Sequence, residues 1–136
     1  MSILIIKNGE CEISINTLIN NFINTKIKFN IIKSYNFKSN NIEELVKKYN
    51  GIIILGGHQS MTELDKFPYL LDVIKLIKYS VESNIPILGI CLGCQMIGKA
   101  FGCEIIKMHK SEIGYHSFVD MTNVGKKDIL FGKYIM

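Results

Sequence analysis

Apolar residues along this chain occur either in short continuous runs or in longer stretches at helical spacing. The continuous runs lie at 2–6 (SILII), 51–55 (GIIIL) and 86–90 (PILGI). Short runs rich in branched side chains predict strands that are buried on both faces of a sheet. Residues 26–32 instead alternate apolar with polar side chains, which predicts a strand that is more exposed.

The stretches 13–23, 41–49, 67–83 and 94–101 are predicted helices. In 41–49, Glu43 and Glu44 near the start and Lys47 and Lys48 near the end suit the helix dipole. The expected buried side of 67–83 carries a larger apolar set, Leu70, Leu71, Ile74, Ile77 and Val81. Strands that alternate with helices predict a parallel sheet with helices on both faces. Ligands bind beyond the carboxyl ends of such strands, so chemistry is expected in the loops 56–60 (GGHQS) and 91–95 (CLGCQ).

Composition limits the classes of protein to which the chain can belong. Its 136 residues, 48% hydrophobic and 21% charged, predict one globular domain over 1–136 without repeats or linkers. The net charge of +4 comes from 16 scattered lysines against 12 acids, with no arginine. Because arginine supplies the planar fork that recognises phosphates and bases, we expect no nucleic-acid partner.

The expected location is the cytoplasm. No run approaches the ~20 apolar residues that span a bilayer, and the first ten residues do not resemble a signal peptide. Neither observation favours a membrane partner. In a reducing compartment the four cysteines are expected to be free thiols rather than disulfides.

The segment GICLGCQ, residues 89–95, carries the strongest chemical signal. A Gly-x-Cys-x-Gly pattern between a strand and a helix is the cysteine version of a nucleophile elbow. Gly89 and Gly93 fit because a side chain at either position would collide with the neighbouring strand or helix. The turn directs the Cys91 sulfur into the crevice at a helix N-terminus. The N–H groups of Leu92 and Gly57 are the expected oxyanion donors.

Two other hypotheses remain for the same segment. Cys91 and Cys94 form a Cys-x-x-Cys pair suited to redox exchange, or they are two small buried hydrophobic residues. The redox hypothesis is disfavoured because in thioredoxin-like domains the pair follows the first strand. It also conflicts with the expectation that Cys94 faces the core. No further ligand spacing suited to zinc occurs, so no metal site is predicted.

GICLGCQ, together with GIIILGGHQS at 51–60 and EIGY at 112–115, resembles a class I glutamine amidotransferase domain. The resemblance is strongest to the amidotransferase part of GMP synthase and covers about residues 51–130. It implies a three-layer α/β fold with a mostly parallel, flavodoxin-like sheet and no cofactor. It also implies release of ammonia from glutamine through a glutamyl thioester, and delivery of that ammonia to a synthase domain or subunit.

The resemblance assigns roles to individual residues. Cys91 would be the nucleophile, and the N–H groups of Leu92 and Gly57 would form the oxyanion hole. Gln95 and Gly56 would help to bind the substrate glutamine. The segment 112–115 would line or brace the pocket.

The sequence departs from the family pattern at the catalytic base. The family uses a histidine followed two residues later by glutamate, and none of the histidines here, His58, His109 and His116, has that context. We therefore expect a domain whose C-terminal part is missing and whose glutaminase activity is impaired. His58 replaces a proline common in the family and is a candidate substitute base, although a solvated position is the favoured interpretation. His109 and His116 are expected on the surface of an extended segment.

Two alternative functions stay open. A γ-glutamyl hydrolase resembles this family, shares the elbow and acts on γ-glutamyl peptides. A non-catalytic remnant would bind glutamine or a partner without turnover.

Overall fold

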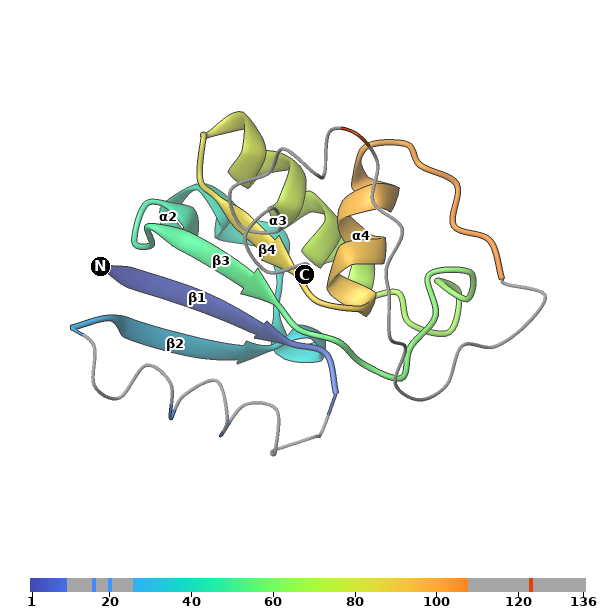
Figure 1. The fold of residues 1–136 in the computed structure, drawn as a ribbon, viewed down its shortest axis with the longest axis horizontal. Helices are drawn as coiled ribbons and strands as arrows, with labels where there is room; N and C mark the ends of the chain where they lie inside the picture. Colours follow the sequence, from blue (N-terminus) through green and yellow to red (C-terminus); the bar gives the residue numbers. More distant parts are fainter. Residues whose placement is uncertain (10–15, 17–19, 21–25, 108–122, 124–136) are drawn as a thin grey trace.

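The sheet at the centre of the molecule is parallel and has four strands. The structure, a computed structural model, describes residues 1–9, 16, 20, 26–107 and 123. The strands are β1 (Ser2–Lys7), β2 (Lys28–Lys33), β3 (Gly51–Ile54) and β4 (Ile87–Gly89), in the order β2-β1-β3-β4 (Figure 1). β1 therefore has β2 on one side and β3 on the other, and the strand order reverses there. The crevice between the carboxyl ends of β1 and β3 is the expected place for a ligand.

The described helices are short apart from two. They are the 3-10 turns η1 (Ser34–Asn36) and η2 (Ser39–Asn41) and the α-helices α2 (Ile42–Val46), α3 (Leu70–Glu82) and α4 (Leu92–Ala100). Figure 1 shows α3 and α4 next to each other, both beside the β3–β4 side of the sheet. The prediction of an α/β fold with a parallel, flavodoxin-like sheet is confirmed.

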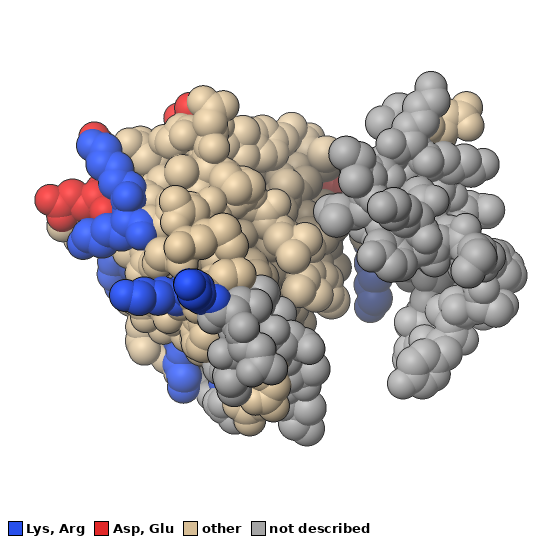
Figure 2. Space-filling model, turned by 60° about the vertical axis from the view of Figure 1, so that its left-hand side comes forward, with Lys and Arg blue, Asp and Glu red and all other residues tan. Residues whose placement is uncertain are grey.

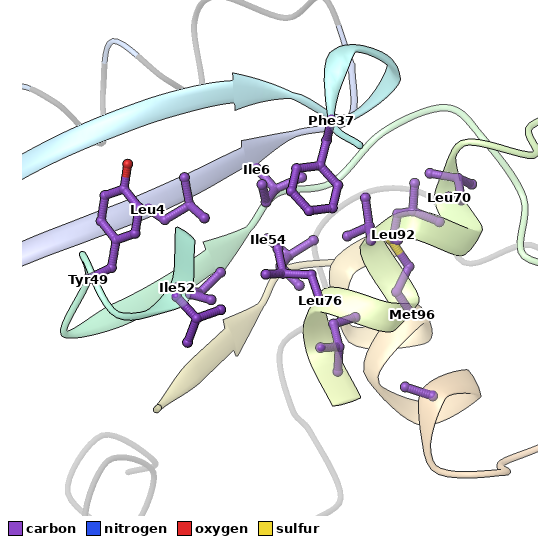
Figure 3. Packing of buried hydrophobic residues seen from close by; sticks show 14 of the residues in the cluster. Leu4, Ile6, Phe37, Tyr49, Ile52, Ile54, Leu70, Leu76, Leu92 and Met96 are labelled. Carbon is purple, nitrogen blue, oxygen red and sulfur yellow. The ribbon is translucent and has the colours of Figure 1, made fainter. Parts of the chain in front are cut away.

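The main hydrophobic core lies between one face of the sheet and these helices. Leu4 and Ile6 of β1 and Ile52 and Ile54 of β3 point into it. From the helices, Leu76, Leu92 and Met96 meet them (Figure 3). Ile5 and Ile53 point to the other face and are also buried, as members of a second cluster. The prediction that β1 and β3 are buried on both faces is therefore confirmed.

The prediction that residues 86–90 form a strand buried on both faces is wrong. β4 covers only 87–89, and Leu88 and Ile90 are 53% and 41% exposed. Within the described residues β4 pairs only with β3, so it is an edge strand of this sheet. Ile87 packs against the main core, whereas Leu88 points to the opposite face. A short apolar run does not by itself distinguish a central strand from an edge strand.

The expected buried side of α3 is also partly wrong. The helix covers 70–82, and its buried residues are Leu70, Val73, Leu76, Ile77 and Ser80. Leu71 and Val81 are 46% and 44% exposed. Ser80 enters the buried face because its hydroxyl donates to the Leu76 carbonyl at 2.7 Å. A serine whose hydroxyl donates to its own helix can lie on the buried face. The spacing of apolar residues does not reveal such a position.

Other predicted elements differ mainly at their ends. α2 ends at Val46, so Lys47 and Lys48 follow the helix instead of closing it. Tyr49 is buried beyond it, and its hydroxyl accepts a hydrogen bond from Asn30 at 2.9 Å. α4 begins at Leu92, two residues before the predicted start at 94. β2 is partly exposed, as predicted. Of the predicted helix 13–23 only Asn16 and Asn20 are described, and 109–116 lie outside the described residues.

Charged side chains gather toward one end of the surface in Figure 2, where acidic groups lie beside basic ones. Lys47 pairs with Glu43 at 2.6 Å in such a contact. Among the described helices none has the length and apolar character needed to cross a bilayer.

Candidate active site

Three chain segments meet beyond the carboxyl ends of β1, β3 and β4. Hydrogen bonds continue the sheet past its strands, from Leu55 N–H to the Ile6 carbonyl and from Ile90 N–H to the Ile54 carbonyl, both 2.9 Å. A Cβ on Gly9 would lie 3.6 Å from the Gly57 Cα. The loop after β3 is thus placed between the end of β1 and the turn that leads from β4 into α4.

Cys91 occupies this turn with an unusual backbone conformation. Its φ is 53° and its ψ is −109°, and it is the residue that caps the N-terminus of α4. Asn84 is the other non-glycine residue at positive φ in the described chain. Such a conformation costs about 1–3 kcal/mol and is kept only where the surrounding structure imposes it. The Cys91 carbonyl accepts from the N–H groups of Cys94 and Gln95 at 3.0 and 3.2 Å, and its thiol is free and exposed.

The two glycines around Cys91 allow the turn to pack closely. A Cβ on Gly89 would lie 2.6 Å from the carbonyl carbon of Gly93. A Cβ on Gly93 would overlap the carbonyl oxygen of Ile54. The start of α4 therefore rests directly on the backbone of β3, and the predicted need for both glycines is confirmed.

The loop after β3 lies beside Cys91. A Cβ on Gly56 would be 3.2 Å from the Cys91 Cβ and 3.9 Å from its sulfur. Gly57 follows, packed against Asn8 and Gln59. Within the described part of the chain, the N–H groups of Gly57 and Leu92 donate to no backbone carbonyl.

Gln95 lies next to a groove of about 680 Å³. The groove separates the loop after β3 from the segment after α4, and its lining residues are Ser60, Thr62, Glu63, Gln95, Glu104, Ile105, Ile106 and Lys107. A hydrogen bond from Lys66, followed by the attraction of its charge, lowers the pKa of the Glu63 carboxyl. Cys91 does not line this groove. The two residues predicted to bind substrate therefore lie in different places, Gln95 at the groove and Gly56 beside Cys91.

The expectation that Cys94 faces the core is wrong. Its side chain is exposed, and the buried residues of α4 are Leu92, Gly93, Met96 and Ala100. Leu92, Met96 and Ala100 turn toward the main core, and Cys94 lies on another side of the helix. The hypothesis that Cys91 and Cys94 are two buried hydrophobic residues is therefore wrong as well.

The position of His58 does not associate it with Cys91. The side chain is exposed, and its ring makes an edge-to-face contact with Phe67 at 6.2 Å between centroids. His109 and His116 lie outside the described residues. Over the described ranges no three metal-binding side chains come together.

A buried polar network next to Gly57 was missed by the sequence analysis. Asn8 donates to the Leu55 carbonyl at 2.6 Å. Gln59 donates to the Asn8 carbonyl at 2.6 Å and to the Tyr69 hydroxyl at 2.9 Å. The available signal was a polar residue, Asn8, directly after a strand buried on both faces, because a polar group there needs partners.

Comparisons with known proteins show which family the sequence resembles. The sequence matches the family described as "Glutamine amidotransferase class-I" over residues 10–133. It is 43% identical over 91 residues to a glutamine amidotransferase-like protein of Acanthamoeba polyphaga mimivirus, covering 67% of this chain and 43% of that protein. It is 40% identical over 74 residues to one subunit of the glutamine-hydrolyzing GMP synthase of Sulfolobus acidocaldarius, covering 54% of this chain and 36% of that protein.

A solved structure has the same fold. The crystal structure of a glutamine amidotransferase from Thermotoga maritima superposes with a TM-score of 0.62 at 28% identity, covering 75% of this chain and 43% of that one. The chain thus spans less than half the length of each of these three relatives.

Proposed function

This chain belongs to the class I glutamine amidotransferase family, and on that premise we propose that Cys91 attacks the side-chain amide of glutamine. The conformation of Cys91 is the observation that carries the proposal. A cysteine at φ 53° between two glycines that permit close packing, at a helix N-terminus, has the form of a nucleophile elbow. A function for this turn, to hold the Cys91 sulfur exposed toward a substrate, would explain why the strained backbone is kept.

The proposed reaction has two steps. The Cys91 sulfur bonds to the amide carbon, the carbon–nitrogen bond breaks, and the thiol proton leaves with the nitrogen as ammonia. Water then hydrolyses the glutamyl thioester to glutamate and regenerates the thiol. In both steps a negative charge develops on the carbonyl oxygen.

The remaining site residues have supporting roles in this proposal. The N–H groups of Leu92 and Gly57 stabilise the oxyanion, and each such donor is worth about 10²–10³ in rate. This role is supported by the observation that neither N–H donates to a backbone carbonyl of the described residues. Gly56 forms the wall of the site next to the sulfur, and Gln95 contacts the part of the substrate that reaches the groove.

Residues 1–136 contain no His-x-Glu pair, and we expect this to lower the rate of glutamine hydrolysis. A free thiol is only a few per cent thiolate at neutral pH, and removing the base of such a unit costs about 10⁴-fold or more. We infer that residues 1–136 alone turn glutamine over slowly. A synthase domain or subunit is the proposed recipient of ammonia, supported by the GMP synthase relative. The free thiols suit a cytoplasmic location.

The test compares two exposed thiols, one on the residue that caps α4 and one in its first turn. Wild type and Cys91→Ser are treated with iodoacetamide, and alkylation of Cys91 and Cys94 is followed by mass spectrometry beside ammonia release from glutamine. We expect faster alkylation at Cys91 and slow ammonia release that Cys91→Ser abolishes and Cys94→Ser retains.

The contrary outcomes point to different functions. Equal alkylation of both thiols without ammonia release would indicate a non-catalytic remnant. Release of the amine from a γ-glutamyl dipeptide but not from glutamine would indicate a γ-glutamyl hydrolase. A reversible disulfide between Cys91 and Cys94 in the wild type would support redox exchange instead.

A further inference from the structure

The geometry points to Gln59 as a positioning residue that, with Asn8 and Tyr69, holds the N–H of Gly57 in place beside Cys91. The inference rests on the proposed function, because it concerns the loop that supplies the second oxyanion donor. The hydrogen bonds of these three side chains go to one another, to the main chain and to Met96, and not to the thiol. Their effect on the reaction is through the loop.

Gln59 ties the loop to two different elements. Its side chain is 7% exposed, and its Nε2 donates to the Asn8 carbonyl at 2.6 Å and to the Tyr69 hydroxyl at 2.9 Å. Asn8 follows β1, and Tyr69 immediately precedes α3. The two protons of the amide are thus both used, and one side chain joins the loop to the sheet and to a helix.

Asn8 fixes the other end of the loop. It is 2% exposed, and its Nδ2 donates to the Leu55 carbonyl at 2.6 Å and approaches the Met96 sulfur at 3.9 Å. Leu55 directly precedes Gly56, and Gln59 follows Gly57 after one residue. Hydrogen bonds therefore hold the Gly56–Gly57 dipeptide from both sides.

The network packs against the main chain of Gly57 itself. A Cβ on Gly57 would collide with Oε1 of Gln59 and would lie 2.9 Å from the Cβ of Asn8. The preceding residue, Gly56, lies beside Cys91, since a Cβ on Gly56 would be 3.2 Å from the Cys91 Cβ. Because the Gln59 side chain packs this closely on Gly57, we expect a change in its position to shift the Gly57 N–H relative to the Cys91 sulfur.

Asn8 Oδ1 and Gln59 Oε1 accept no hydrogen bond from the described residues. In both side chains the N–H donors make the hydrogen bonds to the described residues. The role inferred for the Asn8 and Gln59 side chains therefore rests on the hydrogen bonds that their N–H groups donate.

The experiment uses Gln59→Glu, which keeps the shape of the side chain but removes both N–H donors. Cys91 is modified separately by a chloroketone analogue of glutamine and by iodoacetamide. In the first reaction the thiol displaces chloride while the ketone oxygen occupies the oxyanion site. Iodoacetamide reports mainly on exposure and ionisation of the thiol.

We expect Gln59→Glu to slow the chloroketone reaction roughly 10- to 100-fold, a part of the value of a whole oxyanion donor. The iodoacetamide rate should stay within about twofold of wild type. Tyr69→Phe leaves the bond to Asn8 intact, so its effect should have the same sign and be smaller. Asn30→Asp is the matched control, since Asn30 also donates to a tyrosine hydroxyl at 2.9 Å, on β2. It should change neither rate.

Three results would overturn the inference. The first is a chloroketone rate in Gln59→Glu equal to that in Asn30→Asp. The second is an equal fall of both rates in Gln59→Glu, which means a general effect on the fold or the thiol. In the third, wild-type Cys91 reacts with the chloroketone no faster than Cys94 does. Only this last result also overturns the proposed function, so the two failures are distinguishable.

Discussion

Single residues decide how the turn at Cys91 is built. The backbone on either side of Cys91, which has a strained φ, is held against β3, by the hydrogen bond from Ile90 to the Ile54 carbonyl and by the close packing of Gly93 on Ile54. Gly93 provides the closest of these contacts, at the Ile54 carbonyl. A substitution at this position therefore acts on the sheet and on the turn together.

Gly93→Ala should lower the free energy of unfolding by about 1–3 kcal/mol, because the new methyl group overlaps the backbone of β3. Gly98→Ala on the same helix is the control. Its Cβ would be 3.5 Å from the nearest atom, on Cys103, so the gain in helix propensity should stabilise the protein by about 0.5–1 kcal/mol. Urea denaturation measures both. Equal effects of the two substitutions would contradict the close packing at Gly93.

At the scale of elements, an acidic residue in the first turn of α3 connects this helix to η2, which lies earlier in the chain. Ser39 of η2 donates to Asp72 at 2.6 Å, and Lys75 lies 3.4 Å from the same oxygen. The Ser39 hydrogen bond, and then the interactions with Lys75, hold the pKa of Asp72 below its ordinary value of 3.8. The charged form of Asp72 is thus favoured in the folded protein.

A lowered folded-state pKa means that Asp72 stabilises the fold above pH 3.8 and that this contribution is lost as the pH falls through the folded-state value. Asp72→Asn should therefore cost roughly 0.5–1 kcal/mol at neutral pH, and the cost should shrink below about pH 4. Urea titrations from pH 3 to 7 measure it. A cost that does not depend on pH would show that the charge of Asp72 is not involved.

At the scale of the whole molecule, packing against the sheet decides which face of each helix is buried. The apolar residues of α3 surround more than half of the helix, so its sequence permits more than one buried face. Contact with both the sheet and α4 selects Leu76 and leaves Leu71 exposed. The same contact fixes where α4 begins and which of its residues reach solvent.

Leu76→Ala should therefore cost about 2–5 kcal/mol of unfolding free energy, since it leaves a cavity in the main core. Leu71→Ala should cost less than about 0.5 kcal/mol, because the side chain is 46% exposed. Thermal denaturation under identical conditions compares the pair. Similar losses for both would mean that Leu71 is covered in solution.

The sequence by itself determined the class of fold, the two central strands and the site of the turn at Cys91. Those features follow from local signals, namely the buried runs at 2–6 and 51–55 and two glycines at fixed spacing around a cysteine. The tertiary structure alone decided the exposure of Leu88 in β4, the exposure of Cys94 and the network of Asn8, Gln59 and Tyr69. Each of these depends on contacts between segments far apart in the chain, and a pattern within one segment carries no record of its neighbours.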